Sequence, residues 1–187
     1  MGLKVDVHGA EVSAVKQVIS NQFGSLSWSP AKDADWDAFA DTFLPGASLF
    51  PSARPVKPQT VNQFMERMKR LRAEGKLGTF EETPLGCEVR VFGNVAVAFA
   101  ACEMLENGST VTRDVSATIL VRDNDVWRIA AQAWDIETEL RKIPYDLAER
   151  KSGGARKNGG RGRKGAAPNN AFESGRAMKR SAAQRGR

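Results

Sequence analysis

The amino-acid sequence predicts an α+β fold: a cone-shaped roll in which three N-terminal helices pack on a curved antiparallel meander sheet. Three observations carry this prediction. Apolar residues recur with a helical period up to about residue 75 and with a strand period from about residue 79. Turn-forming residues separate the strand-like segments, and all apolar periodicity stops near residue 150. Helices grouped before a meander are typical of α+β domains.

The three predicted helices lie in GAEVSAVKQVISNQF (9–23), DADWDAFADTFLPG (33–46) and TVNQFMERMKRLRAEG (60–75). Pro45-Gly46 should end the second helix, and Thr60 with Gln63 predicts a capping box at the start of the third. A short strand is expected at 47–50, before a proline-rich loop. The apolar stripes of the helices consist of Val12, Val15, Ile19 and Phe23, of Trp36, Phe39 and Phe43, and of Phe64, Met68 and Leu71.

Four strand-like segments follow, with apolar residues at alternating positions. Their connections, GN, ENGS and DND, are typical of hairpins. The sequence therefore predicts a meander of neighbouring antiparallel strands. The segments are TFEETPLGCEVRVF (79–92), VAVAFAACEML (95–105), TVTRDVSATILVR (110–122) and VWRIAAQAWDI (126–136).

The charge divides the chain into a domain, residues 1–150, and a basic tail, residues 151–187. The domain holds 17 basic and 21 acidic residues, whereas the tail holds 11 Lys or Arg and one acid, Glu173. The tail lacks the apolar residues that could offset its chain entropy, so we expect it to be disordered. It is either a solvated appendage or a segment that binds nucleic acid through its cations, without an aromatic stacking platform.

Composition excludes several other functions. No apolar run reaches the roughly 18–20 residues that span a bilayer, so we expect no membrane contact and a cytoplasmic protein. Cys87 and Cys102 lie in strand-like segments and are expected to be reduced, buried thiols. With His8 as the single histidine, no metal cluster or histidine-based triad can be built. We therefore expect neither a metal nor a cofactor.

The segments WDAFADTF, LPGASLF and LVRDNDVWRIAAQAWD give residues 9–140 a pattern that resembles the nuclear transport factor 2-like superfamily, close to its SnoaL-like and ketosteroid isomerase-like members. The resemblance implies a pocket inside the cone and members that dimerise through the outer sheet face. Isomerase members carry an acid just before a proline at the end of the first strand, where this chain has Phe50. They also use a tyrosine in the first helix, whereas the only tyrosine here is Tyr145. Isomerase chemistry with those two residues is therefore excluded.

Strand register predicts a candidate catalytic group. Three-residue loops at 107–109 and 123–125 would pair Glu103 with Arg113 and Arg113 with Asp135. Two acids around one cation at the end of an apolar cavity could transfer a proton, with Asp135 as general acid/base, Arg113 beside it and Glu103 orienting Arg113. The alternative is an ion-pair network that closes the sheet end. A one-residue slip would move all three to the opposite face. The face expected to meet the helices carries Val97, Phe99, Ala101, Val115, Ala117, Ile119, Trp127, Ile129, Ala131 and Ala133.

Aromatic residues and a methionine either fill the cone or line a pocket for a flat, hydrophobic molecule. We hypothesise a small hydrophobic-ligand-binding protein of the SnoaL-like type, with proton transfer of the isomerase, cyclase or dehydratase class. The alternative is a non-catalytic dimeric adaptor whose basic tail binds RNA or another acidic partner, so the sequence leaves open whether the protein is an enzyme. The expected ligand-binding residues are Trp36, Phe39, Phe43, Phe64, Met68 and Phe99. The expected homodimer face carries Ser116, Thr118, Leu120, Ala130, Gln132 and Trp134, unless that face is solvated.

Overall fold

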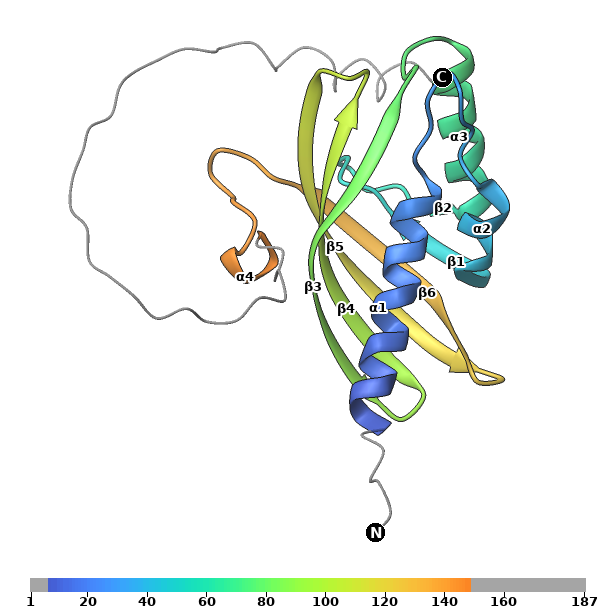
Figure 1. The fold of residues 1–187 in the computed structure, drawn as a ribbon, viewed down its shortest axis with the longest axis vertical. Coiled ribbons are helices and arrows are strands. Elements are labelled where there is room, and N and C mark those ends of the chain that lie inside the picture. The colour runs from blue at the N-terminus through green and yellow to red at the C-terminus, as the bar shows by residue number, and fades with distance from the viewer. Residues whose placement is uncertain (1–6, 149–187) are drawn as a thin grey trace, which may run out of the picture. The chain divides into compact units, whose positions relative to one another are not determined.

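The structure, a computed structural model, describes residues 7–148 of the 187. One six-stranded sheet has the order β2-β1-β6-β5-β4-β3, in which only the β1–β6 pair is parallel (Figure 1). The predicted tail, 151–187, and its boundary near residue 150 lie outside the described residues. The elements are α1 (Val7–Ser25), α2 (Trp36–Asp41), β1 (Phe43–Phe50), β2 (Gln59–Thr60), α3 (Val61–Ala73), β3 (Phe80–Phe92), β4 (Val95–Glu106), β5 (Thr110–Asp123), β6 (Val126–Ile136) and α4 (Tyr145–Ala148).

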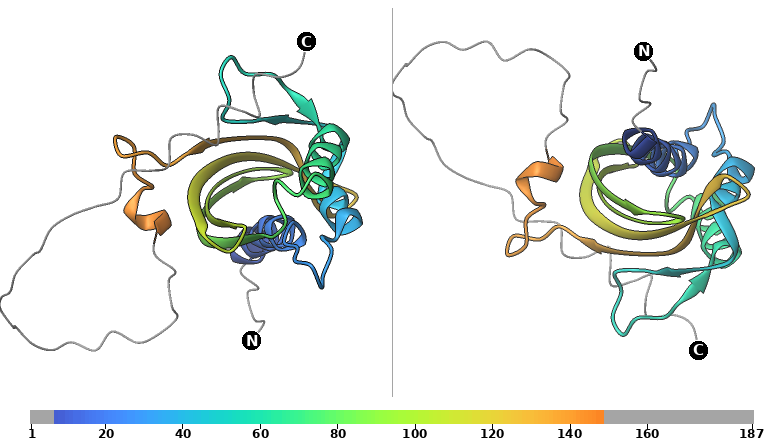
Figure 2. Two further views of the ribbon diagram at one scale, coloured as in Figure 1. Left: turned by 90° about the horizontal axis from the view of Figure 1, so that it is seen from above. Right: turned by 90° about the horizontal axis from the view of Figure 1, so that it is seen from below.

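The long strands β3 to β6 curve around one side of α1, while α2 and α3 stand beside α1 at the open side of this curve (Figure 2). We call the end of the sheet with the β4–β5 hairpin the upper end, and the end with the β5–β6 hairpin the lower end, as they stand in Figure 1. Strand β3 begins, and β6 finishes, toward the upper end. The concave face, toward α1, and the convex outer face therefore offer different environments to alternate residues of each strand.

The four predicted meander strands are confirmed, but the helical part of the prediction is only partly right. The second predicted helix, 33–46, shortens to the six residues of α2, so two substantial helices precede the meander instead of three. Phe43 belongs to β1, where it pairs with Ile129 of β6, and Gly46 has a φ of 82° inside that strand. Parallel pairing with β6 thus overrides the helical spacing of Phe43. The capping box of Thr60 and Gln63 is confirmed.

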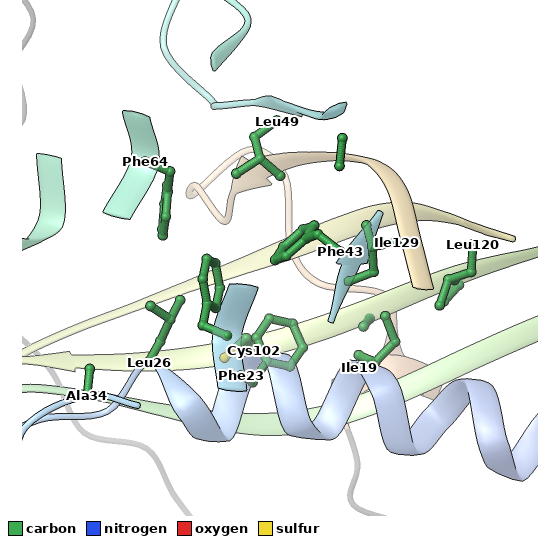
Figure 3. Close-up of a cluster of buried hydrophobic side chains, with 14 of the residues drawn as sticks. Ile19, Phe23, Leu26, Ala34, Phe43, Leu49, Phe64, Cys102, Leu120 and Ile129 are labelled. Atoms are coloured by element: carbon green, nitrogen blue, oxygen red, sulfur yellow. The ribbon is translucent and has the colours of Figure 1, made fainter. Parts of the chain in front are cut away.

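The core lies between α1 and the concave face, where Ile19 and Phe23 of α1 point toward the sheet (Figure 3). The strand residues beneath α1 are small: Ala96, Ala98 and Ala100 are all buried. Small side chains let the helix backbone approach a tightly curved sheet, whereas the convex side has room for large ones.

The predicted orientation of the middle strands is therefore wrong. Val97, Phe99 and Ile119 lie on the outer face with 53%, 47% and 51% of their surface exposed. The residues assigned to a dimer face instead point inward. Gln132 donates to Gln22 of α1 and to Thr118, which gives these buried amides and this hydroxyl their partners. The buried members of that set are Ser116, Thr118, Leu120 and Gln132.

The register is confirmed between β4 and β5, where Glu103 faces Arg113, and wrong between β5 and β6. The β5–β6 hairpin closes through Asn124 and Asp125, both with positive φ, so the loop has two residues instead of three. A bulge next to Ile119 shifts the register again. Asp135 consequently faces Val115 instead of Arg113. The bulge also explains why Trp127 and Ile129 point inward, as predicted, while Ala133 does not.

The short helix α4 covers part of the outer face. Its Leu147 is buried, and Ala101 on β4 is fully buried although it lies on the outer side. A Cβ at Gly86 would lie 2.6 Å from the Leu147 carbonyl oxygen, so glycine permits this close approach. Within residues 7–148, no helix has the length and apolarity needed to cross a membrane.

Candidate functional site

The predicted catalytic group is divided between two ion pairs on the outer face. Arg113 donates from Nε and Nη2 to Glu103 Oε2, at 2.8 and 2.6 Å. Asp135 instead accepts from Arg141 Nη1 at 2.5 Å and from the Ile136 backbone N–H at 2.8 Å. Two of the three residues thus meet as predicted, and none faces the interior. The catalytic roles of Glu103, Arg113 and Asp135 stay predictions.

A shallow hollow of about 320 Å³ lies beside Arg113, between the start of β5 and the segment that follows β6. Acidic and basic side chains both border it, so its charge selects no single kind of ligand. The lining residues are Val111, Thr112, Arg113, Ile136, Glu137, Thr138, Glu139 and Lys142.

Four of the predicted ligand-binding residues, Phe39, Phe43, Phe64 and Met68, are buried in the core. Phe39 lies 5.0 Å from Phe43 and 5.4 Å from Phe64, between ring centroids, so these rings already pack on one another. Trp36 is half-buried at the edge of this group. Ligand contact by these residues stays a prediction.

The last of that set, Phe99, lies on the outer face, so its predicted place inside the cone is wrong. The small alanines of β4 take the inner positions, and Phe99 alternates with them.

Two other acids, Glu82 and Asp114, do point inward near the upper end. Glu82 of β3 pairs with Met104 of β4, and Asp114 of β5 pairs with Cys102 of β4, so β4 alone separates the two carboxylates. Asp114 is buried, and the Oε2 atom of Glu82 is buried without a hydrogen-bond partner. Burial, together with the neighbouring charge of Asp114, raises the pKa of the Glu82 carboxyl well above its usual range. The protonated form of the Glu82 carboxyl is therefore favoured over the form of an exposed glutamate.

The side chains between and beside the two acids are mostly apolar. Cys102 is a free, fully buried thiol whose pKa is raised, first by burial and then by the charges of Glu82 and Asp114. Such a thiol is a packing group instead of a nucleophile. Farther along the same face, Trp134 meets Phe64 of α3 edge to face, at 6.1 Å between ring centroids.

Arg67 of α3 lies beside Phe64. Its guanidinium carbon lies 5.2 Å from the centroid of the Phe64 ring, and its Nε is buried without a hydrogen-bond partner. Burial, and then the charge of Arg70, lowers the pKa of Arg67 from its ordinary value, although the group stays charged at neutral pH. The hydroxyl oxygen of Thr112, next to Met104 in the strand register, is likewise buried without a partner. Buried polar atoms in this state require an explanation such as a bound ligand or catalytic use.

Sequence reasoning missed Glu82, Asp114 and Arg67. Asp114 alternates in step with Ser116, Thr118 and Leu120, so the inverted assignment of faces placed it outside. A weak signal was available, since a run of Asp, Ser and Thr beneath a helix must form internal hydrogen bonds.

The residues that the structure describes contain no group of three or more His, Cys, Asp or Glu side chains that could hold a metal ion.

No protein-family model matches the chain, and no curated protein matches it. Solved structures do match. A candidate dehydratase of the nuclear transport factor 2-like family from Streptomyces avermitilis aligns with a TM-score of 0.57 at 12% identity, over 71% of this chain and 99% of that one. A family protein of unknown function from Shewanella baltica OS155 aligns with a TM-score of 0.52 at 12% identity, over 72% and 100%. A protein with a cystatin-like fold from Nostoc punctiforme aligns with a TM-score of 0.53 at 7% identity, over 68% and 91%.

Identities this low establish a shared fold and leave the activity open. The chain therefore has the nuclear transport factor 2-like fold that its sequence pattern predicts.

Proposed function

We propose that the upper end of the concave face binds a small, largely hydrophobic molecule and transfers a proton on it, with Glu82 as the acid. The main support for this proposal is the Glu82 Oε2 atom, which is buried without a hydrogen-bond partner. It belongs to a carboxyl whose pKa is raised. Two nearby carboxylates with different environments are the usual basis for dividing acid and base roles. This chemistry fits the SnoaL-like isomerase, cyclase and dehydratase classes.

The simplest step is enolisation of a carbonyl compound. The C–H bond beside the carbonyl breaks, and its proton passes to the Asp114 carboxylate. The electron pair moves to the carbonyl oxygen, which takes the proton of Glu82. The reverse transfers restore the protein, so no co-reactant is required.

The test is hydrogen–deuterium exchange of flat, enolisable ketones such as 2-tetralone in D2O, followed by NMR. Wild-type protein should accelerate exchange above buffer, and Glu82→Gln should lower the acceleration by about 10²-fold. Asp135→Asn is the matched control, because it tests the acid that the sequence predicted and that lies on the outer face. Full exchange in Glu82→Gln with loss in Asp135→Asn would transfer the role to Asp135. No acceleration by the wild-type protein would remove the proposed activity.

We also infer a homodimer through the outer face, since Val97, Phe99 and Ile119 leave an apolar patch there. Light scattering after gel filtration should give twice the chain mass. Phe99→Glu should give the monomer mass, whereas the same change at the exposed Val56, outside the patch, should not. A monomeric wild type contradicts the dimer.

The alternative function, an adaptor that binds RNA, depends on the 11 cations and single acid of residues 151–187. Binding should weaken steeply with salt and disappear when the tail is deleted. RNA binding that survives deletion of the tail contradicts this role.

A further inference from the structure

Arg67 differs from two of its neighbouring cations on α3, Lys69 and Arg72. Lys69 pairs with Glu66 at 3.2 Å, and Arg72 pairs with Asp33 and donates to the Ser29 carbonyl at 3.2 Å. Arg67 forms no ion pair with any acid in residues 7–148, although its Nε atom is buried. Removing a guanidinium from water without an anionic partner costs free energy, which a bound anion could offset.

The contacts of α3 show which way this cation faces. Lys69 lies over the Trp36 ring at 5.5 Å and Arg72 reaches the loop at Ser29, so both occupy the flank toward α2. Arg67 lies instead over Phe64, whose ring edge meets Trp134 of β6. The cation is therefore on the side of α3 that faces Trp134 of β6.

We propose that Arg67 binds an anionic oxygen group of the ligand, so that the site selects planar, conjugated carboxylates over neutral analogues. The inference rests on the proposed function, because it names the class of molecule that the same site takes. A guanidinium that lies over an aromatic ring presents its donors at the ring edge, where a planar carboxylate can accept two of them. The half-buried Trp134 ring beside Phe64 then offers an aromatic surface to a flat ligand.

The neighbouring acids are compatible with an anion. Burial raises the pKa of Glu82, and the protonated form that this favours offers a donor instead of a second negative charge. Asp114 remains the repulsive group, and it lies on β5 while Arg67 lies on α3. The carboxylate of the ligand should consequently point toward α3, with the reacting part of the molecule toward the sheet.

The test uses the full chain and three probes, benzoate, benzamide and cyclohexanecarboxylate, in NMR titrations. Benzoate should bind at least about tenfold more tightly than benzamide, as expected for one charge-assisted contact. It should also bind more tightly than the non-planar cyclohexanecarboxylate. Arg67→Gln should remove the preference for benzoate over benzamide, and Arg67→Lys should restore part of it. Arg70→Gln, an exposed position on the same helix, is the matched control and should keep the preference.

A second measurement uses the wild-type protein alone, so it tests the inference even if the Arg67 variants do not fold. The buried Nε–H of Arg67 should give a slowly exchanging arginine resonance in the wild-type protein, and benzoate but not benzamide should shift it. Equal affinity for benzoate and benzamide, a preference that survives Arg67→Gln, or an unshifted resonance would each overturn the inference. Glu82→Gln separates the two proposals: it should keep the benzoate preference while losing proton exchange. Loss of proton exchange in Glu82→Gln together with equal affinities would retain the acid and remove the anion site.

Discussion

The lower and upper ends of the concave face treat buried polar groups in opposite ways. At the lower end, Glu11 of α1 accepts from Arg122 Nη1 at 2.5 Å and from the Trp127 indole at 2.6 Å. Arg122 also donates to Asn94 Oδ1 at 2.9 and 3.1 Å. At the upper end, Glu82 Oε2 and Thr112 Oγ1 have no hydrogen-bond partner.

One sheet thus carries a satisfied polar network that stabilises the fold and, at its other end, unpartnered polar groups that we assign to function. The lower network ties the first half of α1 to the β5–β6 hairpin, and each of its polar groups is satisfied. The upper group costs folding free energy, because buried polar atoms there give up water without a replacement. Unpartnered buried polar atoms are retained in proteins where they bind a ligand or take part in a reaction, although they lower the stability of the fold.

The largest expected effect comes from breaking the lower network. Glu11→Ala leaves both the Arg122 guanidinium and the Trp127 indole without their acceptor. We expect the free energy of unfolding to fall by about 2–3 kcal/mol in urea denaturation at pH 7. Glu88→Ala, which removes an exposed pair with Arg90, should cost less than about 1 kcal/mol. Equal losses in the two variants would show that the lower network adds no more than a surface pair.

The second-largest expected effect is a gain in the free energy of unfolding on substitution of Glu82, and this gain depends on pH. The folded pKa of Glu82 lies above its unfolded value near 4.5. As pH rises through the interval between those two values, the unfolded chain releases its proton first, so wild-type stability falls. Below the interval the two states bind the proton equally. Glu82→Gln removes this loss, and we expect it to be about 1–2 kcal/mol more stable than the wild type at pH 8.

The measurement is the urea midpoint from pH 4 to pH 9. Glu81→Gln, at the exposed position next in sequence, is the matched control and should follow the wild-type profile. A parallel profile for Glu82→Gln would show that the carboxyl titrates as it does in the unfolded chain, and would remove the basis for its acid role.

The sequence predicts the strands of the meander but not which face of each strand points inward. Strand boundaries depend on local alternation and turns, and these located β3 to β6 closely. Both faces of β4 are apolar, however, and in the prediction the larger residues, such as Phe99 of β4 and Ile119 of β5, took the inner positions. The distance at which α1 packs on the sheet determines that the small residues face inward, and this distance depends on the tertiary structure. The bulge beside Ile119 and the two-residue loop at 124–125 likewise depend on pairing that no local pattern fixes.

The candidate site could be predicted only in part, for the same reason. The pairing of Glu103 with Arg113 could be predicted, because it follows from one hairpin alone. The partner of Asp135 could not, since Arg141 lies in the segment after β6. Glu82 and Asp114 become neighbours only across β4, and Arg67 reaches the Phe64 ring beside Trp134 only through the packing of α3, so all three required the tertiary structure.

The smallest expected effect compares two threonines on the same face of β5. Thr118 Oγ1 accepts from Gln132, whereas Thr112 Oγ1 is buried without a partner. Valine has nearly the same shape but no hydroxyl. Thr118→Val should therefore lower the free energy of unfolding by about 1 kcal/mol, while Thr112→Val should leave it unchanged or raise it by less than about 1 kcal/mol. Urea denaturation of both variants at pH 7 measures the difference, and a loss at Thr112 as large as at Thr118 would mean that the upper hydroxyl is satisfied. If Thr112→Val is the more stable protein but accelerates 2-tetralone exchange less, then the unpartnered hydroxyl serves the ligand at the expense of the fold.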